Sequence, residues 1–152
     1  MKRFKIVLVL LTVSLFLSCD TDQDDISLSE AEAKELNLIA QEGEWKISQF
    51  TRNNVENTAN YADYAFVFDD GNNLTAFGSI DEVSGTWRVS NDSGDEFDPY
   101  DDVDFHIFFS SQGKLGELAN NYDVIAATSS EIRLIMQQNS DGDSAKLTFS
   151  KN

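Results

Sequence analysis

The fold class is decided by residues 64–74, which read YAFVFDDGNNL. The aromatic residues at 64, 66 and 68 alternate with smaller ones, and a period of two places the three rings on one face of a β-strand. The next five residues, Asp69-Asp70-Gly71-Asn72-Asn73, are typical of a tight turn. Leu74 starts another apolar segment, so the stretch predicts an antiparallel β-hairpin.

The same alternation recurs along the chain after Gly43. Tight turns join most of the segments, and Pro99 is the only proline. The pattern predicts an all-β domain, an eight-stranded up-and-down antiparallel barrel, because closure pairs every sheet edge. A sandwich of two sheets is the structural alternative. The eight expected strands cover residues 45–48, 64–68, 74–80, 84–90, 104–110, 122–128, 131–138 and 145–150.

One short helix is expected before the strands, over residues 27–42. Ser29 and Glu32 have the spacing of a capping box, and Gly43 is a stop signal. The helix would pack on the β domain, because a single amphipathic helix cannot bury its apolar stripe alone; a partner-binding helix is the alternative. The apolar stripe consists of Ala33, Leu36, Ile39 and Ala40.

The chain begins with a segment typical of a removable leader. Lys2, Arg3 and Lys5 precede the apolar residues 6–17, and such a run is too short to span a bilayer. Removing residues 1–18 leaves 134 residues, enough for one domain. The leader holds three of the 11 basic residues and none of the 27 acidic ones, so its loss moves the formal net charge from −16 to −19. Nucleic acid is therefore not an expected partner.

The leader ends in Leu15-Phe16-Leu17-Ser18-Cys19, which resembles the lipobox of bacterial lipoproteins. The resemblance implies that Cys19 is acylated, becomes the mature N-terminus and holds the protein on a lipid bilayer. Cys19 is the only cysteine, so no intramolecular disulfide can form.

Residues 19–26 are expected to form a solvated acidic tether, since four of the six residues from Asp20 to Asp25 are acids. The run resembles the acid-rich signals that direct some lipoproteins to the outer face of the outer membrane. Asp20 directly after Cys19 also fits a signal for retention in the inner membrane, which would leave the domain facing the periplasm. Both locations place the protein in the cell envelope.

Two Gly-x-Trp motifs, Gly43-Glu44-Trp45 and Gly85-Thr86-Trp87, and the last hairpin resemble the lipocalin-like lipoproteins of bacterial envelopes. The resemblance covers residues 36–151 and gives the barrel domain the bounds 43–152. It implies that Gly43 and Trp45 lie at the closed end of the barrel, and that the barrel holds a small apolar ligand. In lipocalins an Arg near the last strand accompanies this Trp, whereas this chain offers Lys146 and Lys151.

The inward face of such a barrel is either a ligand pocket or a filled core, since eight strands allow both. Small residues on two of the expected strands favour a pocket: Ala76, Gly78, Ala126 and Ala127. The candidate ligand-binding residues are Phe66, Phe68, Trp87, Phe105, Phe109 and Phe149.

No catalytic constellation is present. His106 is the only histidine, which excludes a multi-histidine metal site, and its position between Phe105 and Ile107 predicts the outer, solvated face of a strand. No serine lies in a nucleophile-elbow motif. An enzyme is therefore not expected, and neither a cofactor nor a metal site is assigned.

Residues 91–104 form the longest expected connection and carry seven acids. A solvated loop at one end of the barrel is the main interpretation, and a calcium-binding loop is the alternative. Phe97 and Tyr100 could gate a cavity or meet a partner.

The sequence thus predicts a membrane-anchored envelope lipoprotein with a lipocalin-like barrel that binds a small apolar or amphipathic molecule. The alternative is a structural lipoprotein with a filled barrel that contacts another envelope protein. A void of about 300 Å³ or more would favour the first.

Overall fold

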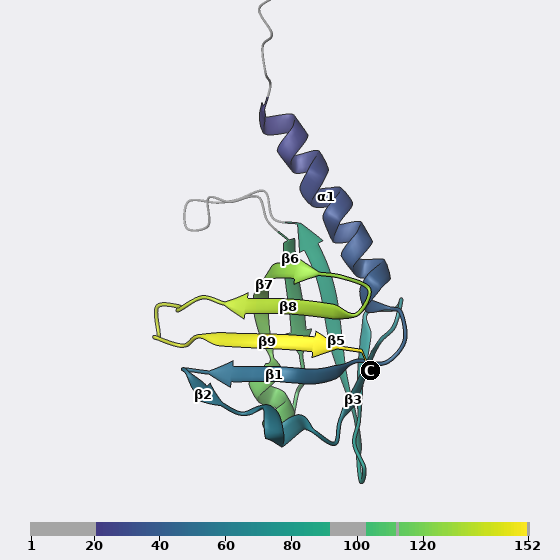
Figure 1. Cartoon of the computed structure of the whole chain (residues 1–152), viewed down its shortest axis with the longest axis vertical. Helices are drawn as coiled ribbons and strands as arrows, with labels where there is room; N and C mark the ends of the chain where they lie inside the picture. The colour runs from purple at the N-terminus through teal and green to yellow at the C-terminus, as the bar shows by residue number, and fades with distance from the viewer. Residues whose placement is uncertain (1–20, 92–102, 112, 152) are drawn as a thin grey trace, which may run out of the picture.

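A computed structural model of the chain describes residues 21–91, 103–111 and 113–151, with side chains from residue 30 onward. In this part of the chain one helix, α1 (Thr21–Ala40), accompanies a single curled antiparallel sheet (Figure 1). Two 3-10 turns, η1 (Thr58–Tyr61) and η2 (Lys114–Leu118), lie between strands. The strands are β1 (Lys46–Arg52), β2 (Val55–Glu56), β3 (Ala65–Phe68), β4 (Asn73–Phe77), β5 (Glu82–Asn91), β6 (Val103–Phe108), β7 (Asn120–Ala127), β8 (Glu131–Met136) and β9 (Ala145–Ser150).

The predicted all-β domain with a preceding helix is confirmed, and the eight expected strands correspond to β1 and β3 to β9. Neighbouring strands from β3 to β9 pair in sequence order, and β9 pairs with β1, as in an up-and-down meander. The two-sheet sandwich is wrong, because all nine strands of the described residues belong to one sheet. As the sheet curls, the front strands β8, β9 and β1 cross the rear strands β5 and β6 (Figure 1).

The closed eight-stranded barrel is also wrong, because the sheet stops as a curled half-barrel. Its two ends touch through one isolated bridge, in which Trp45 and Phe66 exchange backbone hydrogen bonds of 2.9 and 2.8 Å. Beyond the bridge, the segment after β1 occupies the edge of β1. The Phe50 N–H donates to Thr58 Oγ1 (2.7 Å), and the Asn57 N–H donates to the Phe50 carbonyl (2.8 Å). These bonds satisfy groups that closure would have paired with β3.

The sequence did not predict β2. It forms a two-residue hairpin with β1 around Asn53 and Asn54, whose φ angles are 52° and 63°. Asparagine tolerates this left-handed region, and two successive positive φ angles are the signature of the tight turns that suit antiparallel strands.

Helix α1 begins at Thr21, so the expected bounds 27–42 and the separate tether 19–26 need correction from residue 21 onward. No glycine or proline interrupts this stretch, and Asp22, Asp24 and Asp25 lie near the helix N-terminus, where the helix dipole favours negative charge. Ser29 therefore lies inside the helix and does not cap it. The expected apolar face is buried at Ala33, Leu36 and Ala40 and half-buried at Ile39, and α1 packs mainly on β5 and β6.

Candidate functional site

The six aromatic residues that the sequence proposed as pocket lining lie together inside the curl of the sheet. They are at most 3% exposed. The rings of Phe68, Trp87, Phe105 and Phe149 contact one another with centroid separations of 5.2 to 5.6 Å, mostly edge to face, and Phe66 lies 5.5 Å from Phe149. Such contacts are the preferred packing of aromatic rings. The six residues therefore belong to the buried hydrophobic core.

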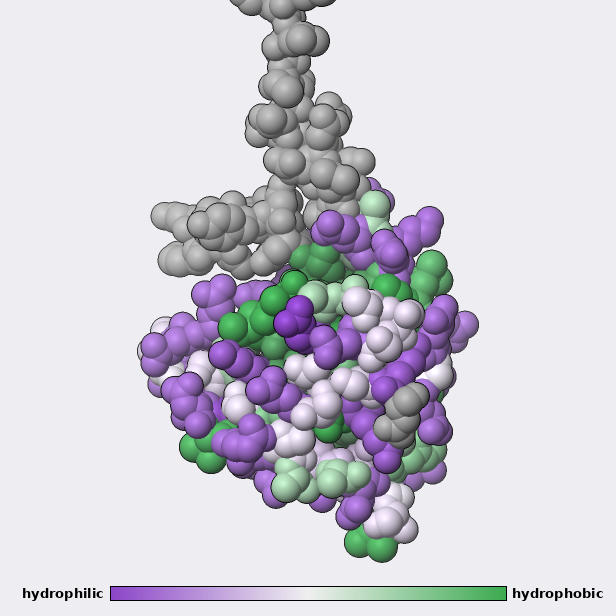
Figure 2. Space-filling model, in the orientation of Figure 1, coloured by the Kyte–Doolittle hydropathy of each residue, from purple (hydrophilic) through white to green (hydrophobic). Residues whose placement is uncertain are grey.

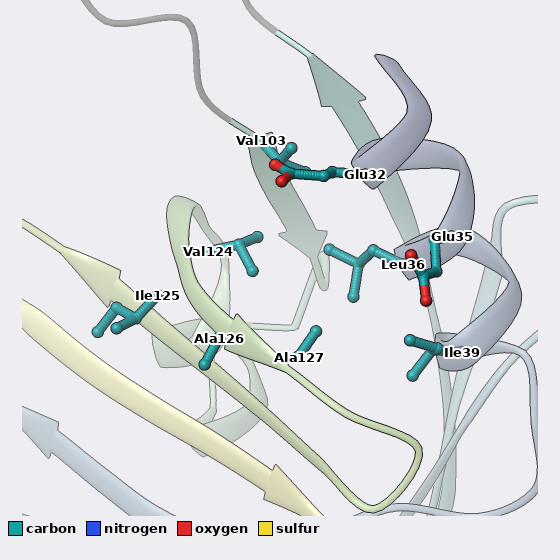
Figure 3. A pocket seen from close by; sticks show the side chains of 9 residues that line it. All are labelled: Glu32, Glu35, Leu36, Ile39, Val103, Val124, Ile125, Ala126 and Ala127. Carbon is teal, nitrogen blue, oxygen red and sulfur yellow. The ribbon is translucent and has the colours of Figure 1, made fainter. Parts of the chain in front are cut away.

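A pocket of about 390 Å³ lies instead between α1 and the strands β6 and β7 (Figure 3). Helix α1 supplies Glu32, Glu35, Leu36 and Ile39, which share one face because their spacings are three and four residues. Figure 3 shows Leu36 and Ile39 pointing from α1 toward Ala127. The sheet supplies Val103 of β6 and four consecutive residues of β7, Val124 to Ala127.

The hollow exists because α1 covers β5 and β6 while Val124, Ala126 and Ala127, in the second half of β7, have short side chains. The pairing of β7 with β8 shifts between Val124 and Ala126, as at a β-bulge. Because of this shift, Val124 lies opposite Leu134 and Ala127 lies opposite Ile132, and both partners on β8 are buried. The extra residue, Ile125, is 55% exposed. Neither valine nor alanine is long enough to fill the space below the helix.

The pocket that the sequence predicts lies inside the barrel, and none of its six aromatic residues lines the pocket beside α1. Ala126 and Ala127 were proposed as small residues that make room, and both line the pocket. Leu36 and Ile39 were assigned to helix packing, which they also perform, and Glu32 was assigned to a cap. The missing information was the crossing position of α1, which a helical period cannot supply. The other proposed pair, Ala76 and Gly78, lies on or after β4, and Ala76 is buried in the core.

The Trp45 side chain connects the end of α1 to the last residues of the described chain. Trp45 is fully buried, its indole N–H donates to the carbonyl of Ala40 (2.9 Å), and Gly43 has a φ of 78° in the turn between them. The Lys151 ammonium lies 4.5 Å from the centre of the Trp45 ring and 3.8 Å from a Glu42 carboxylate oxygen. Lys151 therefore makes a cation–π contact with the Trp45 ring.

His106 lies on the outer face of β6, opposite the buried Phe105 and Ile107, and is half-buried. Its Nε2 accepts a hydrogen bond from Arg88 and lies 3.2 Å from Ser90 Oγ. Desolvation, followed by the charge of Arg88, lowers the pKa of His106. These contacts favour the neutral imidazole.

No group of three or more His, Cys, Asp or Glu side chains placed to hold a metal ion occurs in the described ranges. Cys19, residues 1–18 and most of the acidic connection, including Phe97 and Tyr100, lie outside the described residues. Among the helices that the structure describes, none has the length and apolar character needed to cross a membrane.

Comparisons with known protein families, curated proteins and solved structures gave no significant match for this chain. The candidate site must therefore be judged on its own geometry. That geometry is an apolar hollow at one end of the curled sheet, with two carboxylates on the helix side. Figure 2 shows hydrophobic residues gathered at the same end, on a face that is otherwise largely hydrophilic.

Proposed function

We propose that the chain is an envelope lipoprotein, anchored through Cys19, that binds a small apolar or amphipathic molecule in the pocket between α1 and β7. The observation that carries the proposal is the pocket itself. Its volume of about 390 Å³ falls in the range of small-molecule sites, and most of its lining is aliphatic. The ligand site is thus at the end of the sheet, and the aromatic interior serves as the scaffold.

Three features support a relationship to lipocalin-like lipoproteins. The strands follow one another as in an up-and-down barrel, a helix precedes them, and a buried Gly-x-Trp tryptophan carries a cation on its ring. The acidic run after Cys19 supports a location on the outer membrane surface, with a periplasm-facing inner-membrane location as the alternative.

The proposal is tested by native mass spectrometry of the full chain and of an Ala127→Trp variant. Tryptophan at 127 would fill the space between β7 and the Leu36 and Ile39 side chains. We expect a small molecule to accompany the wild-type chain, to be removed by organic extraction, and to be absent from the variant.

The matched control is Ala62→Trp, which adds the same side chain at an exposed position outside the pocket and should retain the ligand. Thermal unfolding of both variants would show that they are folded. A wild-type chain that carries no small molecule after gentle purification would contradict the proposal, as would a ligand that stays bound in Ala127→Trp.

A second function is favoured by the close packing of the aromatic rings in the interior of the curled sheet. In that case the protein is an interaction lipoprotein that contacts another envelope protein. The exposed apolar side chains Phe108 (58% exposed) and Leu38 (60% exposed) are the first positions at which to place a cross-linker. Cross-linking in intact cells that captures one reproducible partner, together with a ligand-free mass, would support this function.

A further inference from the structure

The polar side chains of the pocket are all of one kind. Within the described lining, Glu32 and Glu35 are the only polar side chains, and the other seven residues are aliphatic. Ionised carboxylates accept hydrogen bonds and donate none. A ligand that satisfies this pocket must therefore bring hydrogen-bond donors at one end and apolar surface at the other.

No salt bridge among the described residues involves Glu32 or Glu35. The basic residues in the described salt bridges are Arg52, Arg133 and Lys151. Lys34 lies between the two acids in sequence, but it lines a separate hollow on the β5 side of α1 with Val89 and Ser90. The negative charge at the pocket is therefore available to a ligand.

The arrangement of the pocket separates a charged edge from an apolar floor. Glu32 and Glu35 are exposed on α1, while Leu36 and Val103 beside them are buried. In Figure 3 the Glu32 side chain extends from α1 to Val103, and the Glu35 carboxylate lies beside Leu36. A cationic head group at this edge would remain partly hydrated while its apolar part covers Leu36, Ile39, Val124 and Ala127.

We infer that the pocket selects a cationic amphiphile, with an ammonium group held by Glu32 and Glu35 and a short apolar chain lying between α1 and β7. The inference rests on the proposed function, since it names the class of ligand for the same pocket. Charge complementarity favours the cation, and an anionic amphiphile of equal length would be repelled by both carboxylates.

The test compares three photoreactive probes that share one eight-carbon chain bearing a diazirine: an ammonium, a carboxylate and an alcohol. Each probe is cross-linked to the purified full chain, and labelled peptides from α1 and β7 are quantified by mass spectrometry. We expect the ammonium probe to label the pocket most strongly. In the double variant Glu32→Gln and Glu35→Gln its apparent affinity should fall about three- to tenfold, while the alcohol probe should change little.

The matched control is the double variant Asp70→Asn and Glu82→Gln, which removes the same charge from exposed positions outside the pocket. It separates local recognition from the attraction of any cation to an acidic protein. Labelling by the ammonium probe should be unchanged in this control.

Four results would overturn the inference: equal labelling of the pocket by all three probes, preferred labelling by the carboxylate, an ammonium preference that survives in the Glu32 and Glu35 variant, or an equal loss in the control. Each of these leaves ligand binding in the pocket intact. Absence of pocket labelling by every probe would instead overturn the proposed function together with the inference.

Discussion

Trp45 links three parts of the molecule through one side chain. Its indole donates to the end of α1, its backbone bridges to Phe66 near the far edge of the sheet, and its ring carries the Lys151 ammonium. All of these contacts are made by a residue with no exposed surface. A substitution at this position therefore affects the helix, the ends of the sheet and the C-terminus together.

Trp45→Ala is expected to lower the free energy of unfolding by about 3 to 5 kcal/mol, because the cavity left by a buried tryptophan adds to its lost transfer free energy. Urea unfolding followed by circular dichroism measures the change. Phe108→Ala, which removes a ring that is 58% exposed, is the control and should change the stability far less. Equal midpoints for wild type and Trp45→Ala would contradict the packing described for this residue.

The second Gly-x-Trp motif needs a glycine at position 85 because the neighbouring strand leaves no room for a side chain there. A Cβ at this position would lie 2.7 Å from Cδ1 of Phe109 and would also collide with the Phe108 carbonyl oxygen. Gly85→Ala should therefore cost about 1 to 3 kcal/mol of stability through overpacking. Gly113→Ala, where no heavy atom lies within 4 Å, is the matched control. A thermal midpoint lowered equally by both substitutions would remove the steric explanation.

Tyr122 predicts how stability depends on alkaline pH. Its hydroxyl donates to the Leu118 carbonyl (3.0 Å), and burial raises the pKa of Tyr122 to about 12. In the unfolded chain this hydroxyl has the ordinary tyrosine pKa of 10.0, so between about pH 10 and pH 12 the folded form holds the proton that the unfolded form has released. The stability of the fold therefore falls as the pH rises through this range. Burial and Glu117 raise the pKa of Tyr61 as well.

The free energy of unfolding, measured by urea titration between pH 8 and 12, should therefore fall less steeply in Tyr122→Phe than in the wild type. The two slopes should differ by up to about 1.4 kcal/mol per pH unit, the limit for one titrating group. The variant loses one hydrogen bond, so its stability at neutral pH should be slightly lower. Identical alkaline slopes would show that Tyr122 does not contribute to the pH dependence.

At the scale of elements, α1 shows both the strength and the limit of sequence patterns. The stripe Ala33, Leu36, Ile39 and Ala40 correctly identified the buried face, because the helical period places these residues on one side. The predicted start of the helix at residue 27 was wrong, because the helix already begins at Thr21. Ser29 and Glu32 have the spacing of a capping box, but both lie inside the helix. Local capping signals compete with propagation of the helix, and the sequence alone does not show which prevails.

The two faces of α1 can be compared directly at Leu36 and Leu38, which are 3% and 60% exposed. Leu36→Ala should cost about 2 to 4 kcal/mol, whereas Leu38→Ala should stay within about 0.5 kcal/mol of the wild type. Chemical denaturation of the two variants measures both values. A larger loss from Leu38→Ala would mean that the helix presents its other face to the sheet.

The segment between β1 and β3 decided whether the sheet closes. No strand is predicted from the sequence for this segment, and the barrel was predicted because closure pairs every sheet edge. The structure uses Thr58 and Asn57 in this segment to bond Phe50, so side-chain and loop contacts replace a strand pair. These contacts join residues eight and seven positions apart, a spacing that neither strand nor helix periodicity reports.

At the scale of the whole molecule, the anchor proposal concerns a residue outside the described ranges. Cys19 lies two positions before the start of α1, so an acyl chain on its thiol would place the helix N-terminus close to a bilayer surface. Acylation contributes about 0.8 kcal/mol of membrane affinity per buried methylene. Cell fractionation with metabolic labelling by an alkyne fatty acid tests the anchor.

Cys19→Ala should abolish the fatty-acid label and release the chain from the membrane fraction. Trp45→Ala, analysed in the same way, keeps the cysteine and should keep the label. An unlabelled wild-type chain, or a Cys19→Ala chain that stays fully membrane-bound, would contradict the anchor.

The sequence by itself determined the approximate positions of every described strand except β2 and the buried face of the helix, because these depend on residue types at short, regular spacings. The acidic character follows from composition. The sequence also found the aromatic residues that gather in the core, since a period of two places them on one face. Only the tertiary structure decided whether those rings line a cavity or fill it, where the sheet ends, and where the pocket lies. These outcomes depend on how α1 crosses the sheet and on the shape of side chains that meet from distant segments, and both are set by packing across the whole fold.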